Sequence, residues 1–165
     1  TDLFNEIIEE GAVDVMTFFL DKGLDPNTTI DLIDTSLLSS ACISEKIDII
    51  SLLLQRGADP NQEDIFGETP TSYAMLSDNV RILDLLIVHG ANLHRCDENG
   101  ESLWMSSSYP AESEVGFRRL ASMRIFPNEV DVATMRNFAE NDLMKERIHV
   151  VTEILKEYGV TLPLP

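Results

Sequence analysis

The sequence predicts an all-α fold in which short antiparallel helix pairs stack into a solenoid. Three segments, FFLDKGLDPN, LLLQRGADPN and LLIVHGANLH, repeat one pattern, and their glycines Gly23, Gly57 and Gly90 lie 34 and 33 residues apart. A period in this range is typical of stacked repeat proteins, because one unit cannot bury its apolar face alone. The 165 residues and 44% hydrophobic content suit one folded domain.

Each unit contains a helix that ends at a glycine. Between residues 80 and 89 the apolar residues follow helical spacing, at Val80, Ile82, Leu83, Leu85, Leu86 and Ile87. Gly90 supplies the left-handed conformation that ends such a helix. The segment 59–61, Asp-Pro-Asn, consists of turn-forming residues. The pattern therefore predicts a helix, a stop and a turn.

The next element of the unit is a hairpin that leads into a new helix. Residues 64–67 have the composition of a tight hairpin tip, Thr69 can cap a helix, and Pro70 suits its first turn. A phosphate-binding loop would need a preceding strand and a Gly-Lys-Ser/Thr ending, and this segment has neither. The glycines are therefore interpreted as residues that end helices and form turns within each repeat.

The phrases GETPTSYA and GADPN resemble the ankyrin-repeat family, whose unit is a hairpin followed by two antiparallel helices. The resemblance implies an ankyrin-repeat solenoid of helix–turn–helix units joined by hairpin loops, with N- and C-terminal capping helices. Residues 1–165 would form one domain, with a cap at 1–27, repeats at 28–61, 62–94 and 95–128, and a C-terminal cap at 129–165. The unit at 95–128 departs from the family pattern at Leu103, Trp104 and Met105, and Trp104 is expected at a core position of a first helix.

The charge of the chain excludes some partners and favours others. The formal net charge is −17, and residues 1–80 hold 16 acidic and 3 basic residues. Such a surface repels nucleic acid and attracts a basic protein, although acidity can also serve solubility alone. No apolar run is long enough for a membrane helix. Only Cys42 and Cys96 are present, which fits a reducing, cytoplasmic location.

The family resemblance implies that hairpin tips and first-helix ends line a concave binding face. On that face we expect an apolar stripe, Ile33, Ile65, Phe66, Leu76 and Tyr109, with a polar rim, Glu9, Glu10, Glu68, Glu98, Asn99 and Glu101. An apolar centre with a charged rim is the composition of a protein-binding patch. The alternative is that some of these side chains, Ile33 and Ile65 first, pack between hairpins as local core.

The sequence offers little catalytic or metal-binding chemistry. His94, Cys96 and Asp97 are close in sequence but lack a second ligand pair, so a hairpin role is favoured over a metal site. Cys42 occupies a small-residue packing position, and a carboxylate pair such as Glu9 and Glu10 would stay solvated on an open face. We therefore expect no catalysis, no cofactor and no metal.

The function predicted from these patterns is non-catalytic binding of a basic protein by an acidic concave face. Its sharpest form is an immunity-type inhibitor of a bacterial toxin such as a nuclease. The alternative is a scaffold or adaptor segment of a longer protein that recognises a peptide or protein segment. The amphipathic segment 141–159 is expected to close the stack as a capping helix, with recruitment of a partner helix as the alternative. The chain alone is expected to be a monomer.

Overall fold

The computed structural model describes residues 2–77, 79–96, 99–105, 114–137 and 142–163, and these are helical with connecting loops. The helices are α1 (Asp2–Glu10), α2 (Val13–Asp21), α3 (Leu37–Ile43), α4 (Ile47–Gln55), α5 (Pro70–Ala74), α6 (Val80–Val88), α7 (Val115–Ser122), α8 (Glu129–Asn137) and α9 (Asp142–Glu157). Over the described ranges extended structure is limited to isolated bridges, such as that between Thr29 and Ser36. The prediction of an all-α fold is confirmed.

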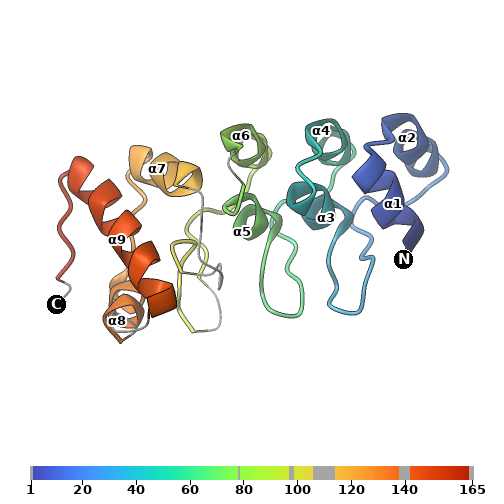
Figure 1. Ribbon diagram of the computed structural model, residues 1–165. Helices are drawn as coiled ribbons and strands as arrows, with labels where there is room; N and C mark the ends of the chain where they lie inside the picture. The colour runs from blue at the N-terminus through green and yellow to red at the C-terminus, as the bar shows by residue number, and fades with distance from the viewer. Residues whose placement is uncertain (1, 78, 97–98, 106–113, 138–141, 164–165) are drawn as a thin grey trace.

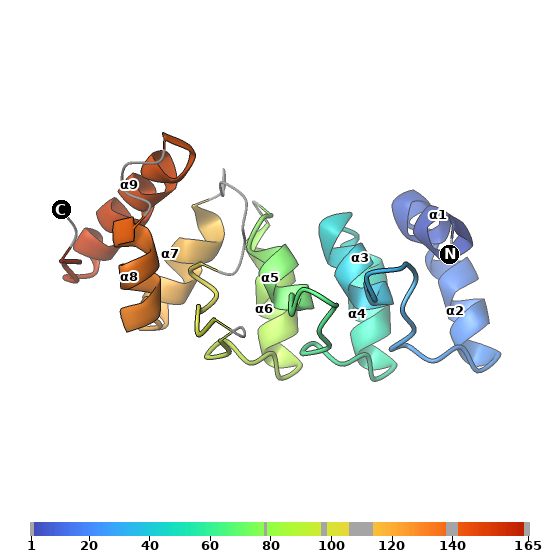
Figure 2. The ribbon, with the colours of Figure 1, turned by 90° about the horizontal axis from the view of Figure 1, so that it is seen from below.

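The helices form two layers in a row of stacked pairs (Figure 1). In one layer α1 packs on α3 and α3 on α5, and in the other α2 packs on α4, α4 on α6 and α6 on α7. The loops before α3 and α5 project from the α1–α3–α5 layer, as the view from that side shows (Figure 2). We call this side the hairpin face. It is the face that the sequence predicted as the concave one.

The repeated glycine ends its helix as expected. Gly57 has φ +91°, its amide donates to the carbonyl of Leu54, and the Ala58 amide donates to that of Leu53. This crossed pair satisfies carbonyls at the end of α4 that have no partner inside the helix. Any residue with a Cβ would be strained at this φ.

The asparagine that closes the GADPN phrase links neighbouring repeats. The Asp59 amide donates to Asn27 Oδ1 at 2.7 Å, and the Asn92 amide donates to Asn61 Oδ1 at 2.7 Å. Asn61 Nδ2 also donates to the Gly90 carbonyl at 3.1 Å. One side chain therefore satisfies backbone groups of the next turn, which explains why the phrase recurs once per repeat.

Apolar side chains fill the space between successive pairs. One core cluster runs from α1 to α6 and includes Ile8, Leu38 and Leu53, and another joins α6, α7 and α9 around Trp104 and Phe117. All five are at most 1% exposed. The indole of Trp104 stacks on the Phe117 ring with centroids 5.1 Å apart. The expectation that Trp104 is a core residue is confirmed.

The secondary structure around Trp104 is not the predicted helix. Residues 103–105 form a turn, and the following segment, 106–113, lies outside the described residues. The Ser102 hydroxyl, at the position where Thr69 caps α5, donates to Asp131 Oδ2 of α8. The carboxylate of Asp131 also accepts from the Ser102 and Asn128 amides at 2.8 Å, and it is fully buried. The structure thus adds a helix, α8, that the sequence interpretation missed.

The two ends of the stack differ in surface composition. The C-terminal helix predicted over 141–159 is present as α9, and its exposed described side chains are Lys145, Glu146, His149, Glu153, Lys156 and Glu157. At the other end, α1 and α2 expose the apolar side chains of Leu3, Val15 and Phe18. The division of the chain into caps and repeats stays a prediction.

Candidate protein-binding surface

Each described hairpin tip on the hairpin face is organised by one aspartate. Asp31 Oδ1 accepts from the amides of Ile33 and Thr35, at 3.0 and 2.9 Å. Burial would raise the pKa of Asp31, but the hydrogen bonds from Thr35 and Ile33 outweigh it and hold the pKa below its ordinary value. The carboxylate is therefore charged at neutral pH and fixes the turn.

The second hairpin repeats this arrangement with an added support. Asp64 Oδ1 accepts from the amides of Phe66 and Glu68, at 2.8 and 3.0 Å, and Tyr73 Oη donates to Asp64 Oδ2. Burial and then the hydrogen bond to Asp64 raise the pKa of Tyr73 well above its ordinary value, so the phenol remains a donor. The tip is anchored both to its own backbone and to α5.

The two hairpins are joined to each other. The Ile65 amide donates to the Ile33 carbonyl at 3.1 Å, so the tip of one repeat is tied to that of the previous one. Thr69 caps α5 and Pro70 takes its first position, as the sequence predicts, and the structure adds a reciprocal capping box between Thr69 and Ser72. These bonds hold the tips in place before any partner arrives.

Large apolar side chains are exposed along this pre-formed face. They are Leu32 at 98% exposure, Ile43 at 55%, Ile65 at 57%, Phe66 at 67% and Leu76 at 41%. Leu32, Ile65 and Phe66 lie on hairpin tips, whereas Ile43 ends α3 and Leu76 follows α5. We call these five residues the hairpin-face patch. Grouped exposed apolar side chains are characteristic of interaction sites.

The structure distributes the predicted site residues unevenly. Ile65, Phe66 and Leu76 are exposed as expected, but Ile33 is half-buried and Leu32 is the exposed residue of its hairpin. Ile43 also joins the patch, at the position equivalent to Leu76 one repeat earlier. Tyr109 and Glu98 lie outside the described residues. A Leu or Ile at a hairpin-tip or first-helix-end position of the repeat was the sequence signal that could have identified Leu32 and Ile43.

The polar residues of the predicted rim also divide into two groups. Glu9, Glu10 and Asn99 are exposed. Glu68 is half-buried within its hairpin, and Glu101 Oε1 accepts a hydrogen bond of 2.8 Å from Thr134 Oγ1 of α8. The first group is accessible to a partner, whereas Glu101 is already engaged within the fold.

Exposed acidic side chains surround the patch. Asp31 and Asp34 lie on the first hairpin beside Leu32, and Glu9 and Glu10 end α1. A base on this side, Arg95, lies 2.8 Å from Glu63 Oε1, so that its charge is balanced. The field at the N-terminal part of the hairpin face is therefore negative, which favours cationic partners.

The remaining features offer little chemistry. Burial raises the pKa of the Cys42 thiol, which keeps it protonated and unreactive. Within the described ranges no three His, Cys, Asp or Glu side chains gather as a metal-binding group, and Asp97 of the sequence-predicted set falls outside those ranges. None of the helices described has the length and apolar character needed to cross a bilayer.

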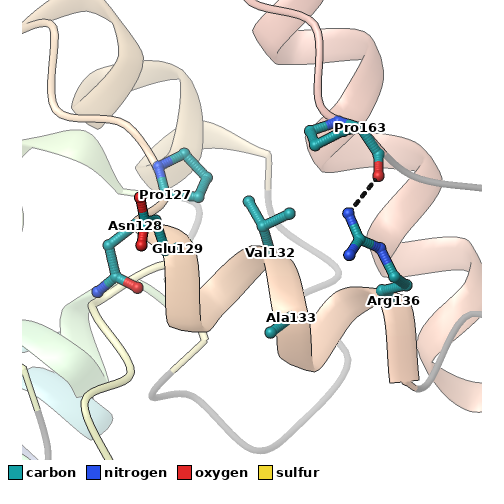
Figure 3. A pocket seen from close by; sticks show the side chains of 7 residues that line it. All are labelled: Pro127, Asn128, Glu129, Val132, Ala133, Arg136 and Pro163. Carbon is teal, nitrogen blue, oxygen red and sulfur yellow. Dashed lines mark hydrogen bonds between the residues drawn. The ribbon is translucent and has the colours of Figure 1, made fainter.

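A groove of 390 Å³ lies between α8 and the C-terminal segment (Figure 3). It is lined by Pro127, Asn128, Glu129, Val132, Ala133, Arg136 and Pro163. Its guanidinium, on Arg136, donates to the Pro163 carbonyl at 2.7 Å, so this cationic group is engaged with the chain itself. The groove has no set of convergent acid, base and nucleophile, and its chemistry does not indicate catalysis.

A row of helix pairs with hairpin tips along one side defines a helical repeat protein with an open binding face. A family model described as ankyrin repeats (3 copies) matches residues 4–97 and 38–114, which together exceed half of the chain. The chain therefore belongs to the ankyrin-repeat family. Ankyrin repeats generally mediate protein–protein interactions and are typically non-catalytic.

Two relatives are similar to part of the chain. A protein of Rickettsia bellii (strain RML369-C), named for its ankyrin repeats, is 34% identical over 70 residues, which are 42% of this chain and 8% of the relative. A fowlpox virus (strain NVSL) protein, also named for ankyrin repeats, is 35% identical over 65 residues, 39% of this chain and 9% of the relative. The matched part thus spans less than a tenth of either relative.

Proposed function

We propose that this chain is a non-catalytic module that binds a basic protein through its hairpin face. The observation that carries the proposal is the hairpin-face patch, whose five apolar side chains are 41% to 98% exposed on one side of adjacent repeats. Leu32, Ile65 and Phe66 act as the central anchors because they stand at the tips of two hairpins that are bonded to each other.

The energetics of such a patch suit moderate to tight binding. Burying one large apolar side chain contributes about 1.5–3 kcal/mol, so a few anchors supply most of the binding free energy. The tips are already fixed by Asp31, Asp64 and the bond between Ile65 and Ile33. A pre-organised surface loses less conformational entropy on binding, and more of the gain remains as affinity.

The acidic residues contribute mainly to the rate and selectivity of association. Residues 1–80 carry 13 more acidic than basic residues, and Glu9, Glu10, Asp31 and Asp34 are exposed beside the patch. Long-range attraction of this kind accelerates encounters with basic proteins and weakens as salt rises. Nucleic acid is repelled by the same field.

The proposal has two narrower forms that differ in the partner. In the first, the chain is an immunity-type inhibitor that covers a basic bacterial toxin such as a nuclease, which the small acidic domain supports. In the second, it is one segment of a longer scaffold that holds a basic peptide or protein segment. The size of the relatives, of which the matched part is 8% and 9%, favours the scaffold form.

The test is affinity capture at low salt from a source lysate, followed by a salt gradient and identification by mass spectrometry. The chain is compared with a Leu32→Ser, Phe66→Ser double variant and with Val88→Ser. Val88 is 80% exposed at the end of α6, in the other helix layer, and serves as the matched control. We expect a basic protein that is retained by the parent chain and by Val88→Ser but lost from the double variant.

Two outcomes would count against the proposal. Retention of the same partners by the double variant would show that the hairpin face is not the binding surface. Partners that are acidic, or that elute independently of salt, would contradict the role of electrostatic attraction. A captured enzyme that loses activity at equimolar chain supports the inhibitor form. A captured segment without activity supports the scaffold form.

A further inference from the structure

The N-terminal end of the stack exposes a second set of apolar side chains, separate from the hairpin-face patch. Leu3 of α1 is 51% exposed, and Val15 and Phe18 of α2 are 43% and 55% exposed. Phe18 contacts the ring of Phe19 edge-on at 5.7 Å, and Lys22 Nζ lies 5.7 Å from the Phe18 centroid. We call Leu3, Val15 and Phe18 the end face.

The same positions are covered in the next repeat. Leu3 and Val15 correspond, 34 residues later, to Leu37 and Ile49, both of which are 0% exposed. The position of Phe18 is taken by Leu52, which is partly buried. The covering elements are α1, which packs on α3, and α2, which packs on α4. The end face therefore has the composition of an interface between repeats.

The opposite end of the molecule is built differently. The exposed described side chains of α9 are all charged or His, as a terminal repeat requires for solubility. A terminal face that stays exposed to water is expected to be polar, whereas the end face groups three exposed apolar side chains, which is characteristic of an interaction site.

A second copy of the chain is a poor occupant for the end face. Head-to-tail stacking would place the apolar end face on the charged surface of α9. Two-fold pairing would bring together the exposed acids Glu6 and Glu10 of both copies, with Lys22 as the nearby base. Like charges across an interface are repulsive, so neither geometry is favourable.

We propose that the end face is a repeat interface whose occupant is a further ankyrin helix pair of the same polypeptide, upstream of Thr1. This pair stacks on α1 and α2 in the register that these helices use on α3 and α4. The proposal concerns assembly of the solenoid and does not depend on the function of the hairpin face.

The internal interface specifies what the added pair must carry. Arg56 Nη1 lies 2.7 Å from Asp21 Oδ1 across the α2–α4 interface, and Lys22 occupies the position of Arg56 one repeat earlier. The added pair accordingly presents an acidic residue to Lys22, at the position that Asp21 holds in α2. Asn27 accepts a hydrogen bond from the Asp59 amide of the next repeat. In the same way, the closing turn of the added pair carries an Asn at the position equivalent to Asn27, and this Asn accepts from the Asp25 amide.

The experiment attaches the chain's own internal repeat as a probe. A copy of residues 35–67, which carries α3, α4 and the hairpin, is fused directly before Thr1. The fusion is compared with the parent chain by thermal unfolding and by hydrogen exchange of the α1 and α2 amides. The same fusion carrying Val15→Asp and Phe18→Asp removes the interface, and Asp14→Ala is the matched control because position 14 is exposed, as are its equivalents Asp48 and Arg81.

We expect the fusion to unfold in one transition at a higher midpoint, with slower exchange in α1 and α2. The double substitution removes the gain, Asp14→Ala keeps it, and in the parent chain the double substitution leaves the midpoint almost unchanged. Unchanged exchange of α1 and α2 in the fusion would overturn the proposal, whether or not the added copy folds. A dimer of the parent chain that Phe18→Asp dissociates, seen by light scattering, would overturn it in favour of a second copy.

Discussion

The hairpin-to-helix junction at residues 64–72 and the related junction at 96–105 begin alike and end differently. Both contain Gly-Glu followed by a hydroxyl residue, Thr69 in one and Ser102 in the other. Thr69 exchanges hydrogen bonds with Ser72 and starts α5, whereas Ser102 donates to Asp131 and is followed by a turn. Both hydroxyls accept from a backbone amide that follows, Thr69 from Ser72 and Ser102 from Trp104 at 3.3 Å, so the two junctions differ in the second bond, which Ser102 makes to Asp131.

The residues after the hydroxyl reinforce this difference. Pro70 is pre-organised for the first turn of α5, and the small residues Thr71 and Ser72 allow close packing. At 103–105 the chain has Leu, Trp and Met, and Trp104 inserts into the core against Phe117 while its Nε1 donates to the Ile125 carbonyl at 3.2 Å. At this junction a buried, hydrogen-bonded indole therefore stands where the preceding unit has the small residue Thr71.

Of the substitutions that test this contrast, Trp104→Ala is expected to lower the free energy of unfolding most. Trp104→Ala removes a fully buried ring and should lower the free energy of unfolding by about 3–5 kcal/mol. Thr71→Val, at the equivalent buried position of the preceding unit, should change it by less than about 1 kcal/mol because the buried Thr71 hydroxyl has no hydrogen-bond partner to lose among the described residues. Urea unfolding measures both, and a loss of less than about 1 kcal/mol for Trp104→Ala would contradict a packing role for the indole in this unit.

Asp131 should rank second. Asp131→Ala leaves the Ser102 and Asn128 amides without their acceptor in a buried site, at a cost of about 2–3 kcal/mol. Asp131→Asn keeps one carbonyl oxygen and should cost less. Chemical denaturation gives the two values, and hydrogen exchange at the Ser102 amide should rise in both. An unchanged free energy of unfolding for Asp131→Ala would mean that α8 does not position the loop around Ser102.

The capping box should have a smaller effect. Thr69→Ala removes the acceptor for the Ser72 amide and should destabilise the chain by about 1 kcal/mol. Because α5 has few residues, its amides should also exchange faster, whereas those of α7 should not change. A loss spread evenly over both helices in hydrogen exchange would argue against a local cap.

Arg124→Gly should give the smallest change and the opposite sign. Arg124 has φ +61° at the helix-ending position where earlier repeats have Gly57 and Gly90. A left-handed non-glycine residue is strained, and the entropy of glycine offsets part of the relief, so we expect a gain of about 0.5–1 kcal/mol. Thermal unfolding measures it, and a loss of stability would show that the Arg124 side chain makes a stabilising contact.

Much of the fold follows from local signals in the sequence. The glycine stops, the cap at Thr69 and the exposure of Phe66 were predictable because each depends on a few adjacent residues and on the repeat period. The exposed side chain of the first hairpin was misjudged. Alternation along 31–35 does not show that the Ile33 carbonyl bonds to Ile65 while Leu32 points to solvent.

The region after Gly100 was less predictable for a different reason. The use of Ser102 depends on Asp131, a residue 29 positions away, and no local pattern shows that contact. Helix α8 has a weak amphipathic pattern, and its start is set by Asn128, whose Oδ1 accepts from the Val130 and Asp131 amides. An Asn followed by acidic residues was the available signal for this helix.

The most direct test of the central claim is photo-crosslinking from the hairpin face. A benzophenone amino acid is placed at Phe66 in one variant and at Val88 in another, and each is irradiated in the presence of the captured partner at low salt. The account predicts a covalent adduct from position 66 and none from position 88. Equal adducts from both positions, or an adduct from position 88 alone, would contradict binding through the hairpin face.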